Sequence, residues 1–408
     1  MRNGSRRSVW RRARLAMMAG AFVLVMLELV LQLAALVPPV GALLSKDGVP
    51  SIVPDEALGH RRNAALADYD DAGFRNATRL TSSRVVVLGD SQCEGYSVSR
   101  EHAWPQQLDA AIDGDVYNMA VAGYGPAEYR VLADEALQLE PQTVIVGLYS
   151  GNDLANAWRS VWQESRAAML KPPLDADPAP ADLPPLELGT TPRHSVESAD
   201  ASQGLAGLLE EHCKLLGIVR ALDRALHGTG AAITLRDDDP DWPWDRLEAE
   251  VREAADPDQL MALDLGPDRR TLLTPRFRLR VLDMSDPRIE EGLRLTLVAL
   301  EQLRDLCRAH HAQLKVALIP TKEWVLAPLA DAPADTALGE LAVAEAQLWE
   351  RVRRELSALE IATIDVLPAL RAAASEGRFP YRNTDDGHPN AAGNAAIADA
   401  VRAAISAE

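Results

Sequence analysis

The chain has 408 residues, 47% of them hydrophobic, and a formal net charge of −18. This apolar share supports a sizeable core and excludes global disorder, and the length suits one large α/β domain with insertions, or two domains. The excess of acidic residues argues against nucleic acid as the main partner, because phosphate binding needs basic patches. The cysteines fit neither a disulfide framework nor a metal-binding spacing: Cys93, Cys213 and Cys307.

The N-terminal sequence predicts a membrane anchor. Residues 1–14 are rich in arginine, and the run 15–37 is apolar apart from Glu28 and Gln32. Its length of about 20 residues matches a membrane span, and arginines before a span hold the N-terminus in the cytoplasm. We therefore expect a basic cytoplasmic segment over 1–14, a transmembrane anchor over 15–37, and a body on the extracytoplasmic side of the cytoplasmic membrane, periplasmic or extracellular. A cleaved signal peptide is the alternative, but the apolar run exceeds the usual length of its hydrophobic region.

Residues 38–83 have turn chemistry and few apolar runs, which is typical of a juxtamembrane segment. From residue 84 onward, strand-like and helical patterns alternate. This alternation predicts a parallel sheet with helices on both faces. The expected strands are 85–88, 116–118, 143–148, 314–319 and 361–366, and the expected helices of the sheet layers are 105–112, 127–139, 289–310 and 391–405.

A large insertion interrupts this alternation. Residues 171–192 are rich in proline and acidic residues, and helical patterns follow near 203–226 and 246–255. We place a mostly helical insertion at about 155–285, within one domain over 84–408, and protein partners could use it. The pair Trp242 and Trp244 could stack on a sugar ring, although capping a small core of the insertion is the favoured interpretation.

A serine and a histidine stand out as candidates for nucleophilic catalysis. Ser91 follows the apolar run 85–88 on the turn Gly89-Asp90, where open α/β sheets present ligands at the strand ends. Near the other end of the chain, His388 follows two carboxylates, Asp385 and Asp386, either of which can fix the ring so that the neutral imidazole acts as a base. Together they resemble a nucleophile with its activating dyad.

Two further loops follow predicted strands. The N–H of Gly123 and the side-chain amide of Asn152 can each donate to a developing oxyanion, and Asp153 would orient the second loop. Cys93, two residues after Ser91, is a rival nucleophile, but a small packing residue is the favoured interpretation because no nearby base is tied to it.

At these residues the chain resembles the SGNH, or GDSL-type, hydrolase superfamily. The likeness is carried by Gly89-Asp90-Ser91, Gly123, Ser150-Gly151-Asn152-Asp153, and the pair Asp385 and His388. The resemblance implies a flavodoxin-like three-layer α/β/α sandwich with a parallel five-stranded sheet, and it covers roughly 84–154 and 289–405. Two positions depart from the family pattern: Gln92, and Ser150 in place of a glycine.

The same resemblance assigns roles. It implies Ser91 as nucleophile, His388 as base and Asp385 as the carboxylate that orients the base. The oxyanion hole would consist of the backbone N–H groups of Ser91 and Gly123 with the amide of Asn152. Neither a metal nor a cofactor is expected.

A finer likeness points to membrane-anchored or periplasmic members that act on exopolysaccharides, including the alginate O-acetylation proteins. It rests on Gly73-Phe74-Arg75, Glu101-His102-Ala103-Trp104-Pro105 and Ile319-Pro320-Thr321-Lys322-Glu323. Within the last stretch, Lys322 could bind an anionic group of the substrate or pair with a carboxylate of the insertion.

The resulting hypothesis is an anchored extracytoplasmic serine esterase or O-acyltransferase. Its substrate would be an ester-linked acyl group, acetyl by preference, on an envelope or extracellular glycan. One alternative is a non-catalytic anchored component of a polysaccharide modification or export complex. Another is a lipid-directed esterase or thioesterase. Water or a sugar hydroxyl could each accept the acyl group.

Overall fold

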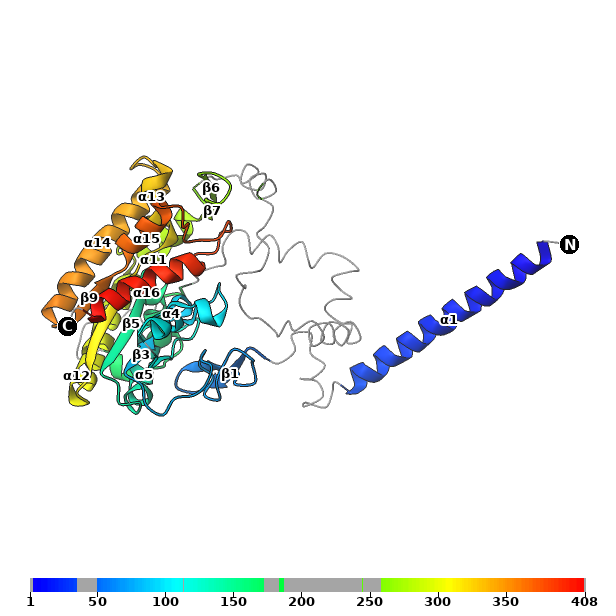
Figure 1. Cartoon of the computed structure of the whole chain (residues 1–408), viewed down its shortest axis with the longest axis horizontal. Coiled ribbons are helices and arrows are strands. Elements are labelled where there is room, and N and C mark those ends of the chain that lie inside the picture. Colours follow the sequence, from blue (N-terminus) through cyan, green and yellow to red (C-terminus); the bar gives the residue numbers. More distant parts are fainter. Residues whose placement is uncertain are drawn as a thin grey trace. The chain divides into compact units, whose positions relative to one another are not determined.

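The computed structural model describes residues 3–34, 50–112, 114–171, 183–186, 244 and 258–406 (Figure 1). Contacts divide these residues into two compact units. One contains helix α1, Asn3–Ala34, and the other contains the elements from β1 to α16. The predicted site residues all lie in the second unit.

Helix α1 covers most of the stretch predicted as a membrane anchor. No helix in the part of the chain that the structure describes is long and apolar enough to cross a bilayer. The predicted anchor over 15–37 is therefore not supported. Its apolar run is interrupted at Glu28 and Gln32, whose side chains hydrogen-bond to each other at 2.7 Å. The extracytoplasmic location stays a prediction.

A parallel five-stranded sheet forms the centre of the second unit, in the order β4-β3-β5-β8-β9. Every neighbouring pair is parallel, which confirms the predicted fold class of an α/β protein with a parallel sheet. The strands agree with the predicted ranges to within one residue. The central strands β3, β5 and β8 are largely apolar and buried, the pattern of strands covered on both faces. The strands are β3 Val85–Leu88, β4 Val116–Asn118, β5 Thr143–Tyr149, β8 Gln313–Ile319 and β9 Ala362–Asp365.

Helices cover both faces of this sheet. The right-handed crossover rule places α4 and α16 on one face and α5, α12 and α14 on the other. The packing agrees, since α4 contacts α16 and α5 contacts α12, and Arg351 of α14 pairs with Glu290 of α12 at 2.6 Å. The helices are α4 Trp104–Ala111, α5 Pro126–Leu137, α12 Pro287–Ala309, α13 Lys322–Ala330, α14 Ala337–Ala358, α15 Leu367–Ser375 and α16 Ala391–Ser406.

The described ends of the predicted insertion pack onto the sheet unit. After β5 come three short helical elements, α6 Asp153–Trp158, η2 Arg159–Gln163 and η3 Ala168–Leu170. Before α12 come an antiparallel hairpin, β6 Met261–Asp264 with β7 Arg270–Leu273, and helix α11, Pro275–Leu282. The helices predicted near 203–226 and 246–255 lie outside the described residues.

Of the predicted aromatic pair in the insertion, the structure describes Trp244, and this side chain is a packing residue. Trp244 is 7% exposed and clusters with Leu260 and Leu272, while the guanidinium of Arg270 lies 5.5 Å from its ring centre. This arrangement favours a small core over an open sugar platform. Trp242 lies outside the described residues.

The segment predicted as a juxtamembrane approach is partly built into the sheet unit. Residues 52–62 form an antiparallel hairpin, β1 Ile52–Asp55 with β2 Gly59–Arg62. Leu58 and Phe74 are each only 1% exposed and join the main core. The sequence pattern did not reveal this packing, because the segment has few consecutive apolar residues.

Candidate active site

Ser91 lies at the carboxyl end of β3, as predicted. The strand ends at Leu88, and the short helix α3, Ser91–Glu94, begins at the serine itself. Asp90 caps this helix, its Oδ1 accepting a hydrogen bond of 2.9 Å from the N–H of Gln92. Because Ser91 is the first residue of the helix, its own N–H has no acceptor within the helix. The serine is 9% exposed, which leaves its hydroxyl at the rim of the sheet.

Cys93 packs beneath this turn. Its sulfur fills the space beside Gly89 and Gly147, where a Cβ on either glycine would collide with it. The thiol is free and fully buried, and burial raises its pKa well above the usual range. A thiol that stays protonated is a poor nucleophile, so the structure supports the packing interpretation of Cys93.

His388 and Ser91 are far apart in the sequence but lie side by side in the structure. Nε2 of His388 lies 2.7 Å from Oγ of Ser91, within hydrogen-bond distance. The loop that carries the histidine precedes α16, and the ring of Tyr96, in the turn after α3, lies against the imidazole at a centroid distance of 5.1 Å. The predicted convergence of these two side chains is present in the fold.

The predicted pairing of Asp385 with His388 is wrong in the structure, because Asp386 takes that place. Oδ1 of Asp386 lies 2.5 Å from Nδ1 of the ring and also accepts the backbone N–H of His388 at 3.1 Å. Asp and Asn side chains commonly bond the backbone two residues ahead, and this turn delivers the carboxylate to the ring. Asp385 is 4% exposed, and its Oδ2 is buried with no hydrogen-bond partner among the described residues.

The contacts of His388 and Asp386 favour an ion pair between them. Burial alone would lower the pKa of His388, but the Asp386 carboxylate outweighs it and raises that pKa above its ordinary value. Burial would likewise raise the pKa of Asp386, yet His388 and the hydroxyl of Ser97 together hold it well below its usual range. Asp386 is thus a stable anion that fixes the tautomer and orientation of the ring.

Lys322 is not open to a substrate, so the structure does not fit the first of its two predicted roles, binding an anionic group. Among the described residues it also forms no ion pair with a carboxylate of the insertion, its second predicted role. It is fully buried at the start of α13, and its Nζ donates to the carbonyls of Thr384 and Asp386 at 2.9 and 2.8 Å. A third contact, of 3.3 Å, reaches Oγ1 of Thr271. Lys322 therefore holds the backbone of the His388 loop, since an ammonium has three donors and each has an acceptor here.

The loop that contains Gly123 turns sharply after β4. Gly123 has φ of +89°, a left-handed conformation that glycine adopts without strain. Its N–H donates no hydrogen bond within the described part of the chain, whereas the neighbouring Ala122 is held on both sides. The N–H of Ala122 donates to Oε2 of Glu94 at 2.8 Å, and its carbonyl lies 3.0 Å from Nε2 of His60.

A buried ion pair connects Ser91 to the Gly123 loop, and sequence reasoning missed it. Glu94, three residues after Ser91 in α3, is fully buried and binds Arg62 of β2 through two hydrogen bonds of 2.7 and 2.8 Å. Tyr69 donates a third bond to the same carboxylate at 2.8 Å. Since Glu94 also holds Ala122, one carboxylate sets the Gly123 loop against the helix of the serine.

Asn152 and Asp153 follow β5, as predicted. Burial raises the pKa of the Asp90 carboxyl, and the side chain of Asn152 is among the groups that oppose this rise. Asp153 is fully buried and accepts the N–H of Tyr149 at 2.9 Å and the hydroxyl of Tyr129 at 3.0 Å. Asp153 thus orients the loop, in the role expected of it.

Ser150, which departs from the family pattern, has a defined partner. Its hydroxyl donates at 2.6 Å to Glu345 of α14, a buried carboxylate that also accepts the N–H of Thr321 at 2.8 Å. Burial raises the pKa of Glu345 to about 7. Through Glu345, Ser150 therefore connects the loop after β5 to Thr321, the residue before Lys322.

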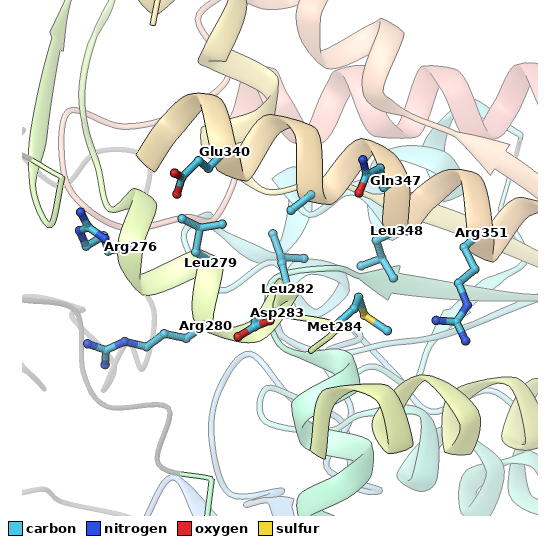
Figure 2. A pocket seen from close by; sticks show the side chains of 11 residues that line it. Arg276, Leu279, Arg280, Leu282, Asp283, Met284, Glu340, Gln347, Leu348 and Arg351 are labelled. Atoms are coloured by element: carbon cyan, nitrogen blue, oxygen red, sulfur yellow. The ribbon is translucent and has the colours of Figure 1, made fainter. Parts of the chain in front are cut away.

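A cavity of about 780 Å³ lies apart from these residues, between α11 and α14. Its walls combine the apolar side chains of Leu282, Met284 and Leu348 with charged residues such as Arg280 and Arg351 (Figure 2). Ser91, Asp386 and His388 do not line it. The candidate site is therefore assigned from the distances between these side chains and not from this cavity.

No protein-family model and no curated protein matches this sequence. Solved structures that are similar to it include a GDSL-like lipase from Bacteroides thetaiotaomicron, at 11% identity over 80% of this chain and 88% of that chain, with a TM-score of 0.33. A psychrotrophic esterase from Pseudoalteromonas shares 12% identity over 79% and 96% of the two chains, at a TM-score of 0.31.

A phospholipase A1 from Streptomyces albidoflavus shares 13% identity over 79% of this chain and 99% of that chain, at a TM-score of 0.33. TM-scores near 0.3 decide neither family nor activity, so the geometry of the site has to carry the function.

Proposed function

We propose that this chain is a serine esterase or O-acyltransferase in which Ser91, His388 and Asp386 act in sequence. The observation that carries the proposal is the pair of contacts on one imidazole: Ser91 Oγ at 2.7 Å from Nε2, and Asp386 Oδ1 at 2.5 Å from Nδ1. A hydroxyl is a weak nucleophile until an adjacent base removes its proton, and this base has its second nitrogen fixed by a carboxylate.

The reaction follows from this geometry. Nε2 of His388 takes the Ser91 proton as Oγ attacks the carbonyl carbon of the ester, and the carbonyl oxygen becomes an oxyanion. The N–H groups of Ser91 and Gly123 and the amide of Asn152 would donate to it. The intermediate then breaks its bond to the alcohol oxygen, which receives the proton from His388, and an acyl-enzyme remains. A water molecule or a sugar hydroxyl, activated by the same histidine, takes the acyl group and restores Ser91.

The glycan O-acetyl group as substrate is supported by the sequence resemblance in three stretches. In the structure, residues of these stretches are internal: Phe74, Arg75 and Trp104 are each no more than 1% exposed. They build the fold, so the substrate class has to be tested directly. Incubation with acetylated glycans, with and without an unacetylated acceptor, followed by mass spectrometry, distinguishes release of acetate from its transfer.

The nucleophile is tested with a fluorophosphonate probe on the whole protein. Labelling of wild type at Ser91 is expected, and Ser91→Ala should abolish both labelling and hydrolysis of activated esters. Cys93→Ala is the matched control, because it removes the rival nucleophile from the same short helix and should keep the label. An unlabelled wild type would instead favour a non-catalytic component, and equal hydrolysis by Ser91→Ala would exclude this serine.

A further inference from the structure

An arginine from the far end of the insertion reaches the His388 loop. Arg278 lies on α11, and its Nη2 occupies the space where a side chain at Gly387 would begin, so any Cβ there would collide with it. The hydroxyl of Tyr149, the last residue of β5, borders the same space, at 3.4 Å from that Cβ position. Gly387 directly precedes His388, so the guanidinium and the phenol stand next to the base.

The polar atoms of these two side chains are unsatisfied. The side chain of Arg278 is 11% exposed and donates no hydrogen bond within the described residues, and its Nε is buried without an acceptor. The hydroxyl of Tyr149, which is 2% exposed, is likewise buried without a partner. Burial raises the pKa of Tyr149, so this group stays a protonated donor. Unpaired buried donors cost free energy, and their occurrence in a folded protein calls for an explanation such as a ligand.

The nearest counter-charge leaves these donors available. Oε2 of Glu323 stands 3.7 Å from Nε of Arg278, too far for a hydrogen bond. The other oxygen of Glu323 already accepts the N–H and hydroxyl of Thr274, at 2.9 and 3.1 Å, at the start of α11. Glu323 therefore balances the charge of the arginine and fixes its helix, but does not occupy its N–H groups.

The position of Arg278 determines which part of a substrate it faces. In the proposed reaction His388 returns its proton to the departing alcohol, so groups beside His388 border the alcohol part of the ester. The guanidinium also acts on the imidazole, because its charge opposes protonation of His388 and offsets part of the rise in pKa that Asp386 causes. A planar guanidinium binds a carboxylate through two parallel hydrogen bonds better than any other side chain does.

We propose that Arg278, assisted by the hydroxyl of Tyr149, binds a carboxylate on the alcohol part of the ester substrate. This inference rests on the proposed function and deepens it, because it makes the preferred substrate an anionic ester. In a chain with a net charge of −18, an anionic substrate gains little from the overall field. The guanidinium of Arg278, a buried cation beside His388, would then account for a preference for anionic over neutral esters.

The same helix supplies matched controls. Arg276 and Arg280 are each two residues from Arg278, which places them on the other side of α11, where both line the cavity against α14 (Figure 2). Arg276 pairs with Asp258 at 2.8 Å. Substitution of Arg280 removes the same charge from the same helix without touching the His388 loop.

The test compares kcat/KM for O-acetylglycolate and its neutral isostere O-acetylglycolamide, at a pH where His388 is fully deprotonated. Wild type is expected to prefer the anionic ester by about 10- to 100-fold, the range for a charge-assisted hydrogen bond. In Arg278→Gln this ratio should fall to about 1. Arg278→Lys keeps the positive charge but loses the planar pair of donors that binds a carboxylate, so it should retain part of the wild-type preference. Arg280→Gln should keep the wild-type ratio.

Three results would overturn the proposal. The first is a wild type without preference for the anionic ester. The second is an equal loss on both esters in Arg278→Gln and Arg278→Lys, which would make the arginine a structural support of the loop. The third is an equal fall of the ratio in Arg280→Gln, which would assign the effect to overall charge. Failure of the proposed function looks different, because wild type would then hydrolyse neither ester faster than Ser91→Ala.

Discussion

The loop that carries Ser91 and the loop that carries His388 are held by contacts of different kinds. Ser91 is placed locally: a buried strand ends, Asp90 caps the next four residues, and the serine begins the helix. The His388 loop relies on side chains from elsewhere in the chain. Lys322 of α13 holds two of its carbonyls, and Ser97 donates to Asp386.

This difference separates what local sequence determines from what only the fold determines. A strand followed by a capped turn depends on adjacent residues, so the position of Ser91 could be predicted from them. The position of His388 depends on a lysine ammonium that donates to three acceptors distant from it in the sequence. Variants on each side of the site test whether the two loops differ in this way.

The largest effect is expected at the carboxylate of the His388 loop. Asp386→Asn should lower kcat by about 10⁴-fold, because an amide can stabilise the wrong tautomer of His388 and cannot balance its charge. Asp385→Asn is the matched control and should stay within about tenfold of wild type, since Asp385 does not contact the ring. Steady-state hydrolysis of an activated ester measures both. A larger loss in Asp385→Asn than in Asp386→Asn would restore the assignment that the sequence favoured.

The second effect belongs to the loop after β5. Asn152→Ala removes one donor from the proposed oxyanion hole and should reduce kcat by about 10²–10³-fold, with little change in KM. The fold should persist, because Asp153 and not Asn152 holds the backbone of Tyr149. Circular dichroism and the rate of fluorophosphonate labelling check the two statements separately. An unchanged kcat would remove Asn152 from the site.

The sequence predicted the sheet and the serine well for a common physical reason. The strands β3, β5 and β8 are apolar runs that are almost fully buried, and the polar residues that follow such runs mark the edge where ligands bind. Ser91, Gly123 and Asn152 were all predicted as site residues in this way. The signals are short, contiguous and independent of the rest of the chain.

The remaining parts of the site depend on contacts that no local pattern encodes. Lys322 could be read as a substrate ligand because its burial is invisible in the sequence. Arg62 and His60 belong to a hairpin with few apolar residues, and Arg278 lies at the far end of a long insertion. Asp386 is a partial exception: the tendency of an aspartate to bond the backbone two residues ahead could have favoured it over Asp385.

A third prediction concerns Glu345, the buried carboxylate that connects the loop after β5 to the residue before Lys322. Glu345 accepts bonds from Ser150, near Asn152, and from Thr321, which precedes Lys322. Its pKa is about 7 in the fold against 4.5 for an unperturbed glutamate. A raised pKa contributes stability that is complete below the unfolded value and is lost as pH rises through the folded value. This group should therefore lower the free energy of unfolding by about 3 kcal/mol between pH about 4.5 and 7.

Glu345→Gln provides the comparison, because glutamine keeps an acceptor and does not titrate. Urea unfolding of both proteins at several pH values gives the difference in free energy of unfolding. That difference should shift in favour of the variant as pH rises through about 7. A difference that stays constant with pH would show that the pKa of Glu345 is not raised and that water reaches its carboxylate.

The smallest expected effect is a change in the pH at which activity is lost. His388 must be neutral to accept the Ser91 proton, and its pKa is raised above 6.5 because Asp386 outweighs burial. Wild-type kcat/KM should therefore fall as pH drops through a value above 6.5. In Asp386→Asn, burial remains without the carboxylate, so the midpoint should move below the wild-type value. Ser97→Ala keeps the carboxylate and loses only one hydrogen bond to it, so the shift should be smaller. NMR titration of the His388 ring in the three proteins gives the order directly, and equal midpoints would mean that Asp386 does not control the protonation of the base.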